Sequence, residues 1–170
     1  QASSGGSGPP PVDPTDFPIL NNAADALVRA DGVAYPPVTT QYLDGATTMY
    51  CGRSYNGIDY FNIDTIVLGF DTSGIDALKT LQSAWLDIYV KLVGSADART
   101  IVGDYYTGAM SVAAHAENIA GTAAFTPVTV TALAVGAIVS IPLLALSNIN
   151  KDGHTKIRLQ ISGGAPTGAN

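Results

Sequence analysis

The sequence predicts an all-β protein, an antiparallel sandwich or barrel, and three observations lead to this prediction. The 170 residues include 18 glycines and 10 prolines, a composition that favours turns and strands over helices. Two segments, residues 81–93 and 155–161, alternate between apolar and polar side chains, as half-buried strands do. Further short strand candidates are separated by Gly, Pro, Asn and Asp turns, which is typical of sandwiches and barrels.

The chain begins with a segment unlike the rest. Residues 1–18 are rich in Gly, Pro and Ser, so they cannot bury enough apolar surface to offset the entropy lost on ordering. We expect an extended arm here, held by a neighbouring chain, with one domain over residues 19–170. Residues 21–29, NNAADALVR, combine an Asn cap with good helix formers and predict one or two helical turns.

The strongest strand prediction is residues 81–93. One face would carry Ala84, Leu86, Ile88, Val90 and Leu92, and the other Trp85, Asp87, Tyr89 and Lys91. Residues 155–161 repeat this pattern after a turn at 151–153. Ile157, Leu159 and Ile161 would face inward, and Lys156, Arg158 and Gln160 outward. Residues 61–70, FNIDTIVLGF, change phase along their length, which indicates either a bulge near Thr65 or burial of both faces.

Weaker candidates complete the expected order of elements. The strand candidates are residues 32–35, 47–55, 99–106, 128–133 and 138–143. Residues 112–119 and 144–149 are each expected to form a helical turn. None of these turns is long enough to organise the fold.

Charge and composition exclude several classes of function. The net charge is -6, so the chain has no basic stripe to neutralise phosphates and nucleic acid is not expected as a partner. No run of about 18 apolar residues is present, so we expect no membrane span. The single cysteine, Cys51, can form neither an internal disulfide nor a cysteine-based zinc site.

The residues suited to catalysis or metal binding are few. Ser73 lies in a Phe-Asp-Thr-Ser-Gly element without a Gly-x-Ser-x-Gly elbow, and such a run predicts a turn rather than a nucleophile. Asp104, His115 and Glu117 could be read as an acid–base set, but a solvated loop is the preferred interpretation. We therefore predict no enzyme activity and no cofactor, and leave open only calcium bound by turn aspartates.

Exposed aromatic rings could serve as a glycan platform or as a protein interface. The candidates are Trp85, Tyr89, Tyr105 and Tyr106. The alternation places Trp85 and Tyr89 on the outward side of their strand. Cover by another subunit or by the arm is preferred over a bound sugar, because large exposed apolar patches usually mark an interface.

Residues 69–90, GFDTSGIDALKTLQSAWLDIYV, resemble the signature of a jelly-roll module of phage virion proteins and bacterial surface or secreted proteins, described as DNRLRE-like or carbohydrate-binding-module-like. The matching residues are Phe70, Asp71, Thr72, Ser73, Ile75, Leu81, Ser83, Ala84, Leu86, Ile88, Tyr89 and Val90. Residues 30–33 resemble the family's opening strand, and residues 149–158 its late strand. The resemblance implies an antiparallel jelly-roll β-sandwich.

The family has one more strand than this chain, which stops at Asn170 after GGAPTGAN. Either the chain continues in a parent protein or another molecule caps the edge, and surface wrapping by the Pro-rich arm is preferred over strand donation. The resulting hypothesis is a non-enzymatic structural subunit, such as a capsid decoration protein, fibre or adhesin, on a virion surface or outside the cell. It would contact other subunits, including copies of itself. The alternative is a carbohydrate-binding module of a larger secreted or surface protein.

Overall fold

The structure is a computed structural model, and it describes residues 25–44, 48–94 and 99–166. The strands are β1 (Asp25–Gly32), β2 (Thr39–Asp44), β3 (Gly52–Tyr55), β4 (Phe61–Asp71), β5 (Trp85–Val90), β6 (Thr100–Tyr105), β7 (Val128–Thr129), β8 (Ala137–Pro142) and β9 (His154–Ile161). Three short 3₁₀ turns join them: η1 (Val112–Ala114), η2 (Val130–Ala132) and η3 (Leu146–Asn148). The predicted arm, residues 1–18, lies outside the described residues.

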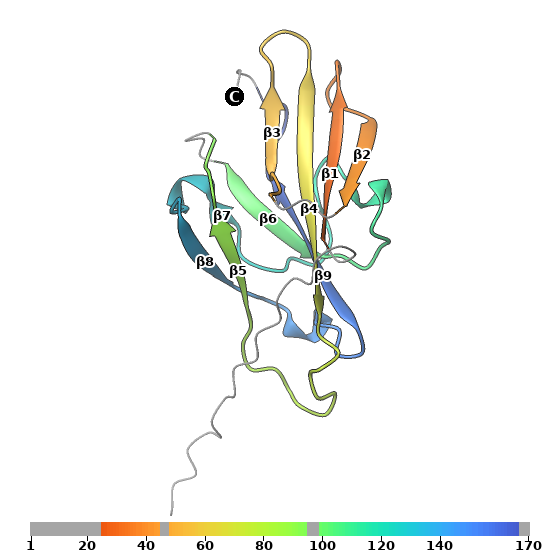
Figure 1. The fold of residues 1–170 in the computed structure, drawn as a ribbon, viewed down its shortest axis with the longest axis vertical. Helices are drawn as coiled ribbons and strands as arrows, with labels where there is room; N and C mark the ends of the chain where they lie inside the picture. The colour runs from red at the N-terminus through yellow and green to blue at the C-terminus, as the bar shows by residue number, and fades with distance from the viewer. Residues whose placement is uncertain (1–24, 45–47, 95–98, 167–170) are drawn as a thin grey trace, which may run out of the picture.

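Two antiparallel sheets make up the fold (Figure 1). Seven strands form the large sheet, in the order β2-β1-β4-β9-β6-β7 with β3 also paired to β4, and β5 pairs with β8 to form the small sheet. Every strand pair is antiparallel. The all-β, antiparallel character predicted from the sequence is therefore confirmed.

β4 is the central strand, and its sequence shows why. Its register with β1 runs without a gap through Thr65, so the phase change reflects burial of both faces and not a bulge. Along one edge, β4 pairs first with β3, up to Gly52 opposite Asp64, and then with β9, from Thr65 opposite Gln160. The two strands thus share one edge of β4 in succession.

The helical prediction for residues 21–29 is wrong from Asp25 onward, and residues 21–24 lie outside the described part of the chain. Residues 25–29 open β1, which lies between β2 and β4. Ala26, Leu27 and Val28 are all buried. Because pairing on both edges satisfies the backbone and burial covers both faces, tertiary context outweighs the helix propensity of this segment.

Several predicted boundaries shift by a few residues. The candidate at 32–35 is the end of β1 followed by a bend, and the candidate at 47–55 contains only β3. Residues 128–133 form the two-residue β7 followed by η2, and the long candidate at 81–93 contains the shorter β5. β2 was not predicted at all.

The hydrophobic core lies between the two sheets. Leu86 of β5 and Ile141 of β8 pack in the same cluster as Leu27, Leu68 and Leu159 of the large sheet. Phe125, which is 2% exposed, also belongs to this cluster. The small sheet therefore covers the apolar face of the large one.

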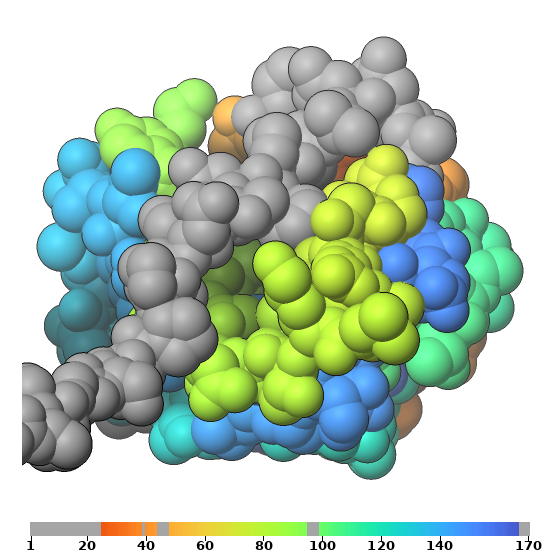
Figure 2. Space-filling view, turned by 90° about the horizontal axis from the view of Figure 1, so that it is seen from below, coloured from red at the N-terminus to blue at the C-terminus, as the bar shows by residue number. Residues whose placement is uncertain are grey.

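The segments that connect the strands pack against the sheets and against one another. Figure 2 shows residues 72–84 in yellow-green beside the blue segment that contains Lys151, whose Nζ donates to the carbonyl oxygens of Ala77 and Lys79. On the second face of the large sheet, Val28, Val67 and Ala114 form a separate buried cluster. The segment around η1 therefore covers the face that the small sheet leaves open.

Candidate binding face

The outer face of the small sheet gathers exposed apolar side chains. In the β5–β8 register Trp85 lies opposite Pro142, Asp87 opposite Ser140, and Tyr89 opposite Ile138. All six side chains point away from the core, because Leu86 and Ile141 at the alternate positions are buried. We call these six residues the outer face.

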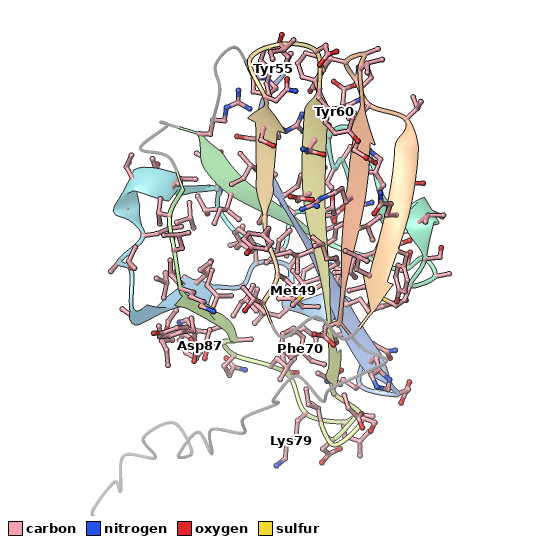
Figure 3. All side chains as sticks on the ribbon, turned by 45° about the horizontal axis from the view of Figure 1, so that its top comes forward. Met49, Tyr55, Tyr60, Phe70, Lys79 and Asp87 are labelled. Carbon is pink, nitrogen blue, oxygen red and sulfur yellow. The ribbon has the colours of Figure 1, made fainter. Side chains whose placement is uncertain are left out.

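Two aromatic rings dominate the outer face. Trp85 is 59% exposed and Tyr89 is 66% exposed, and Ile138 beside Tyr89 is also 66% exposed. Asp87 lies between the two rings, and Figure 3 places it on β5, apart from Tyr55 and Tyr60 at the opposite end of the large sheet. Single exposed apolar residues are ordinary, but a group of exposed rings and apolar side chains on one sheet face is a candidate binding surface.

Both outer edges of the small sheet carry backbone groups without a recorded partner. The Leu143 N–H donates to Ala84 O at 2.9 Å, which fixes the phase of the ladder, since bonded and non-bonded pairs alternate along antiparallel strands. Asp87 and Ser140 are therefore a non-bonded pair. The backbone N–H and C=O of Asp87 point away from β8, and those of Ser140 point away from β5. Among the described residues no other strand pairs with either edge. Just beyond the end of β8, however, Leu143 forms an antiparallel bridge with Phe125, and the Leu144 N–H donates to Ala124 O at 2.7 Å.

A shallow hollow lies beside the outer edge of β8. It measures about 370 Å³ and is bounded by residues 126–128 on one side and by Val139, Ser140, Ile141 and Pro142 on the other, with Leu144 at one end. Pro142 has no N–H to offer, which suits the last residue of an edge strand. The hollow adds apolar surface next to the outer face.

The other two predicted aromatics lie elsewhere. Tyr105 is buried, its hydroxyl donates to Leu144 O at 2.8 Å, and burial raises the pKa of its phenol. Tyr106 is half-buried on the second face of the large sheet, where the Arg158 guanidinium carbon lies 4.9 Å from its ring centroid. Neither ring joins Trp85 and Tyr89.

Asp104 is held in an ion pair and is not placed like a catalytic acid. Arg158 donates to both of its carboxylate oxygens, at 3.0 and 2.6 Å, and the Gly121 N–H donates to one of them at 3.0 Å. Glu117 is exposed, whereas Asp104 is only 2% exposed. The two carboxylates therefore occupy different environments. Asp104 is buried and paired with Arg158, whereas Glu117 is exposed to solvent.

Buried Arg53 and Gln160 form a polar network that the sequence analysis missed. Arg53 donates to Ile161 O at 2.7 Å, to Tyr35 Oη at 2.5 Å and to Asn118 Oδ1 at 2.9 Å. Gln160 Nε2 donates to Thr65 Oγ1 at 3.0 Å. Most of the acceptors of Arg53 are backbone or amide oxygens, so the network joins segments of the fold and offers no reactive group.

The remaining candidate positions form turns. Ser73 donates from its hydroxyl and from its backbone to Asp71 Oδ1, at 2.6 and 3.1 Å, and these bonds lower the pKa of the Asp71 carboxyl. The predicted turn at this site is thus confirmed.

Burial raises the pKa of the Cys51 thiol to about 12. In the described part of the chain no three His, Cys, Asp or Glu side chains are grouped closely enough to hold a metal ion.

Comparisons of the chain with models of known protein families, with curated proteins and with solved structures find no match. Among the residues described, no helix has the length and apolar character needed to cross a bilayer. The outer face is therefore interpreted from its own geometry.

Proposed function

We propose that this chain is a non-enzymatic structural subunit of a virion or cell-surface assembly, and that it acts by binding other protein subunits, including copies of itself. The observation behind this proposal is the outer face, where Trp85, Tyr89 and Ile138 are each more than half exposed. Desolvation of such a surface favours association, and Trp and Tyr are enriched among the residues that dominate interface energies.

The finer parts of the proposal rest on sequence resemblance. Residues 69–90 resemble a jelly-roll module of virion and bacterial surface proteins, and we extend this to a jelly-roll arrangement of the strands. A location on a virion surface or outside the cell follows from the same resemblance. The small sheet supports an assembly role independently. Among the described residues no further strand pairs with β5 or β8, and an unpaired strand edge is a template for further strands.

The test is the oligomeric state of the full chain, measured by sedimentation over a range of concentrations. Wild type is compared with the double variant Trp85→Ser/Tyr89→Ser, called the face variant. The control is Val38→Ser/Ile58→Ser, which removes two side chains that are 85% and 79% exposed in the connections after β1 and after β3. Wild type and control should associate and the face variant should not; equal association of all three would contradict the proposal.

A second candidate function is supported by a specific feature of the same face. Trp85 and Tyr89 lie on one side of one strand with Asp87 and Ser140 between them, which combines two stacking surfaces with groups that can bond hydroxyls. A carbohydrate-binding module would bind immobilised glycans as a monomer and lose this binding on Trp85→Ala. Glycan binding without self-association would favour this function over the structural one.

A further inference from the structure

We propose that residues 9–17 of one copy, which we call the leader segment, bind the outer face of a neighbouring copy. This inference rests on the proposed assembly function and names the partner of the outer face. The leader segment reads Pro-Pro-Pro-Val-Asp-Pro-Thr-Asp-Phe and precedes β1, outside the described residues.

The chemistry of the outer face suits a proline-rich partner. Exposed Trp and Tyr rings are the surface on which Pro-rich segments dock in several recognition modules, because the flat proline ring packs on an aromatic ring. A run of prolines favours the polyproline II conformation before binding. Little backbone entropy is then lost on docking, which lets a short segment bind.

The two surfaces also agree in length. Polyproline II has three residues per turn and rises about 3.1 Å per residue, so Pro11, Pro14 and Phe17 would share one side over about 19 Å. Trp85 and Tyr89 are four residues apart on β5, about 13 Å at 3.3 Å per residue. Lys91, the residue after β5, is exposed, and at the same rise it lies about 20 Å from Trp85. Three apolar leader residues therefore match the length from Trp85 to Lys91.

Charge sets the direction of the segment. The leader segment carries Asp13 and Asp16, three residues apart and so on one side, and it contains no Lys or Arg. Lys91, the residue after β5, is exposed, and among the described residues its Nζ donates only one long hydrogen bond, to Thr48 Oγ1 at 3.5 Å, whereas Asp87 lies between the two rings. Placing Asp16 near Lys91 pairs opposite charges and directs the acidic side away from Asp87.

The reach of the leader allows contact between copies. Residues 18–24 connect the leader segment to Asp25 and can span at most about 28 Å. A domain of this size has a radius of gyration of about 15 Å, so the leader segment can pass beyond its own domain to one packed against it. Because the leader and the outer face are different surfaces, the contact is head-to-tail and builds rings or filaments.

The experiment uses full-length chains and the single tryptophan, Trp85. In the leader variant, prolines 9, 10, 11 and 14 are all replaced by Ser, which leaves every described residue unchanged. Sedimentation gives the association of wild type, of the leader variant, of the face variant and of a 1:1 mixture of the two variants. Trp85 emission, read in wild type and in the leader variant, reports directly on cover of the outer face.

The proposal expects the leader variant to associate at least about thirtyfold more weakly than wild type, the loss typical of removing a hot-spot contact. Its Trp85 emission should shift to the red. Each variant alone should remain monomeric, and the mixture should form heterodimers, because one partner keeps the outer face and the other keeps the leader.

Three outcomes would overturn it. Unchanged association of the leader variant, with loss in the face variant, rejects the leader while the proposed function stands. Unchanged association of the face variant rejects both. The third outcome is a wild type that is monomeric but whose Trp85 emission lies to the blue of that of the leader variant. This result would show that the leader segment binds the outer face of its own copy.

Discussion

At the scale of single residues, Arg53 joins three parts of the chain. It is 6% exposed and its donors reach Ile161 at the end of β9, Tyr35 after β1, and Asn118 in the segment that covers the sheet. Ile161 follows the last residue of β9 that pairs with β4. Arg53 therefore satisfies a carbonyl near the point where β3 and β9 exchange places along β4.

Replacing Arg53 by Met should lower the free energy of unfolding by about 3 kcal/mol, because hydrogen bonds from a charged group contribute about 1.5–3 kcal/mol each and buried acceptors would lose their partner. Urea unfolding followed by circular dichroism measures the loss. The control is Lys79→Met, which removes a positive charge from an exposed side chain in the connection after β4. Surface substitutions of this kind change stability by about 0.5 kcal/mol or less, so equal losses would contradict this role for Arg53.

His115 makes the stability of the fold depend on pH. Its ring is half-buried, its Nδ1 has no hydrogen-bond partner among the described residues, and burial, with the charges of Arg53 and Arg158, lowers its pKa from 6.5. Below pH 6.5, therefore, His115 is protonated more readily in the unfolded chain than in the folded chain. Stability is fully present above pH 6.5 and falls as the pH drops toward the lowered pKa.

The variant His115→Gln should lose this part of the pH dependence. Unfolding free energies at pH 7.5 and pH 5.5 should differ less in the variant than in wild type. His154→Gln provides the matched control, because that histidine is exposed on β9 and its replacement leaves the buried site intact. An unchanged difference in His115→Gln would show that other groups cause the pH dependence.

At the scale of elements, the sequence predicted best where alternation is strict. β5 and β9 were recognised from their two-residue period, and Trp85 and Tyr89 were placed on the outward side of β5. The partner half of the outer face, Ile138 and Pro142, was not predicted. The cross-strand register that brings it alongside β5 joins segments about fifty residues apart, and no local pattern records such a pairing.

For β1 and for the polar side of β9, the local sequence pattern predicted the wrong structure or the wrong exposure. A local signal gave a helix at residues 25–29, whereas the fold uses them as a strand bonded on both edges. Arg158 and Gln160 were expected to face outward, yet Gln160 is fully buried beneath the segment around η1. Alternation identifies two faces of a strand, but it does not show whether a covering segment buries the polar one.

Gly103 in β6 is required by close packing. A Cβ there would lie 2.3 Å from Phe125 Cε1 and 2.6 Å from its Cζ, and the Phe125 ring is buried without room to move. Gly103→Ala should therefore lower the free energy of unfolding by about 1–3 kcal/mol, as overpacking does. Gly52→Ala in β3 is the control, because nothing lies within 4 Å of its Cβ position; equal losses in thermal unfolding would reject the packing argument.

At the scale of the whole molecule, the two sheets differ in how firmly they are held. β4 is paired along both edges, while β5 and β8 bond only to each other among the described residues. A lone pair of strands is marginally stable in water, so the small sheet depends on packing of its inner side chains against the core. Its outer face is exposed and contributes no burial of this kind.

Amide hydrogen exchange should therefore show two levels of protection. Peptides covering β5 and β8 should exchange faster than peptides covering β4 and β9, because opening the small sheet breaks fewer hydrogen bonds than global unfolding. The proposed association of copies predicts that raising the protein concentration slows exchange in β5 and β8 and leaves β4 unchanged, since binding stabilises the closed state by mass action. The face variant should lack this concentration dependence. Equal protection of both sheets at low concentration would show that the small sheet is held as firmly as the large one without a partner.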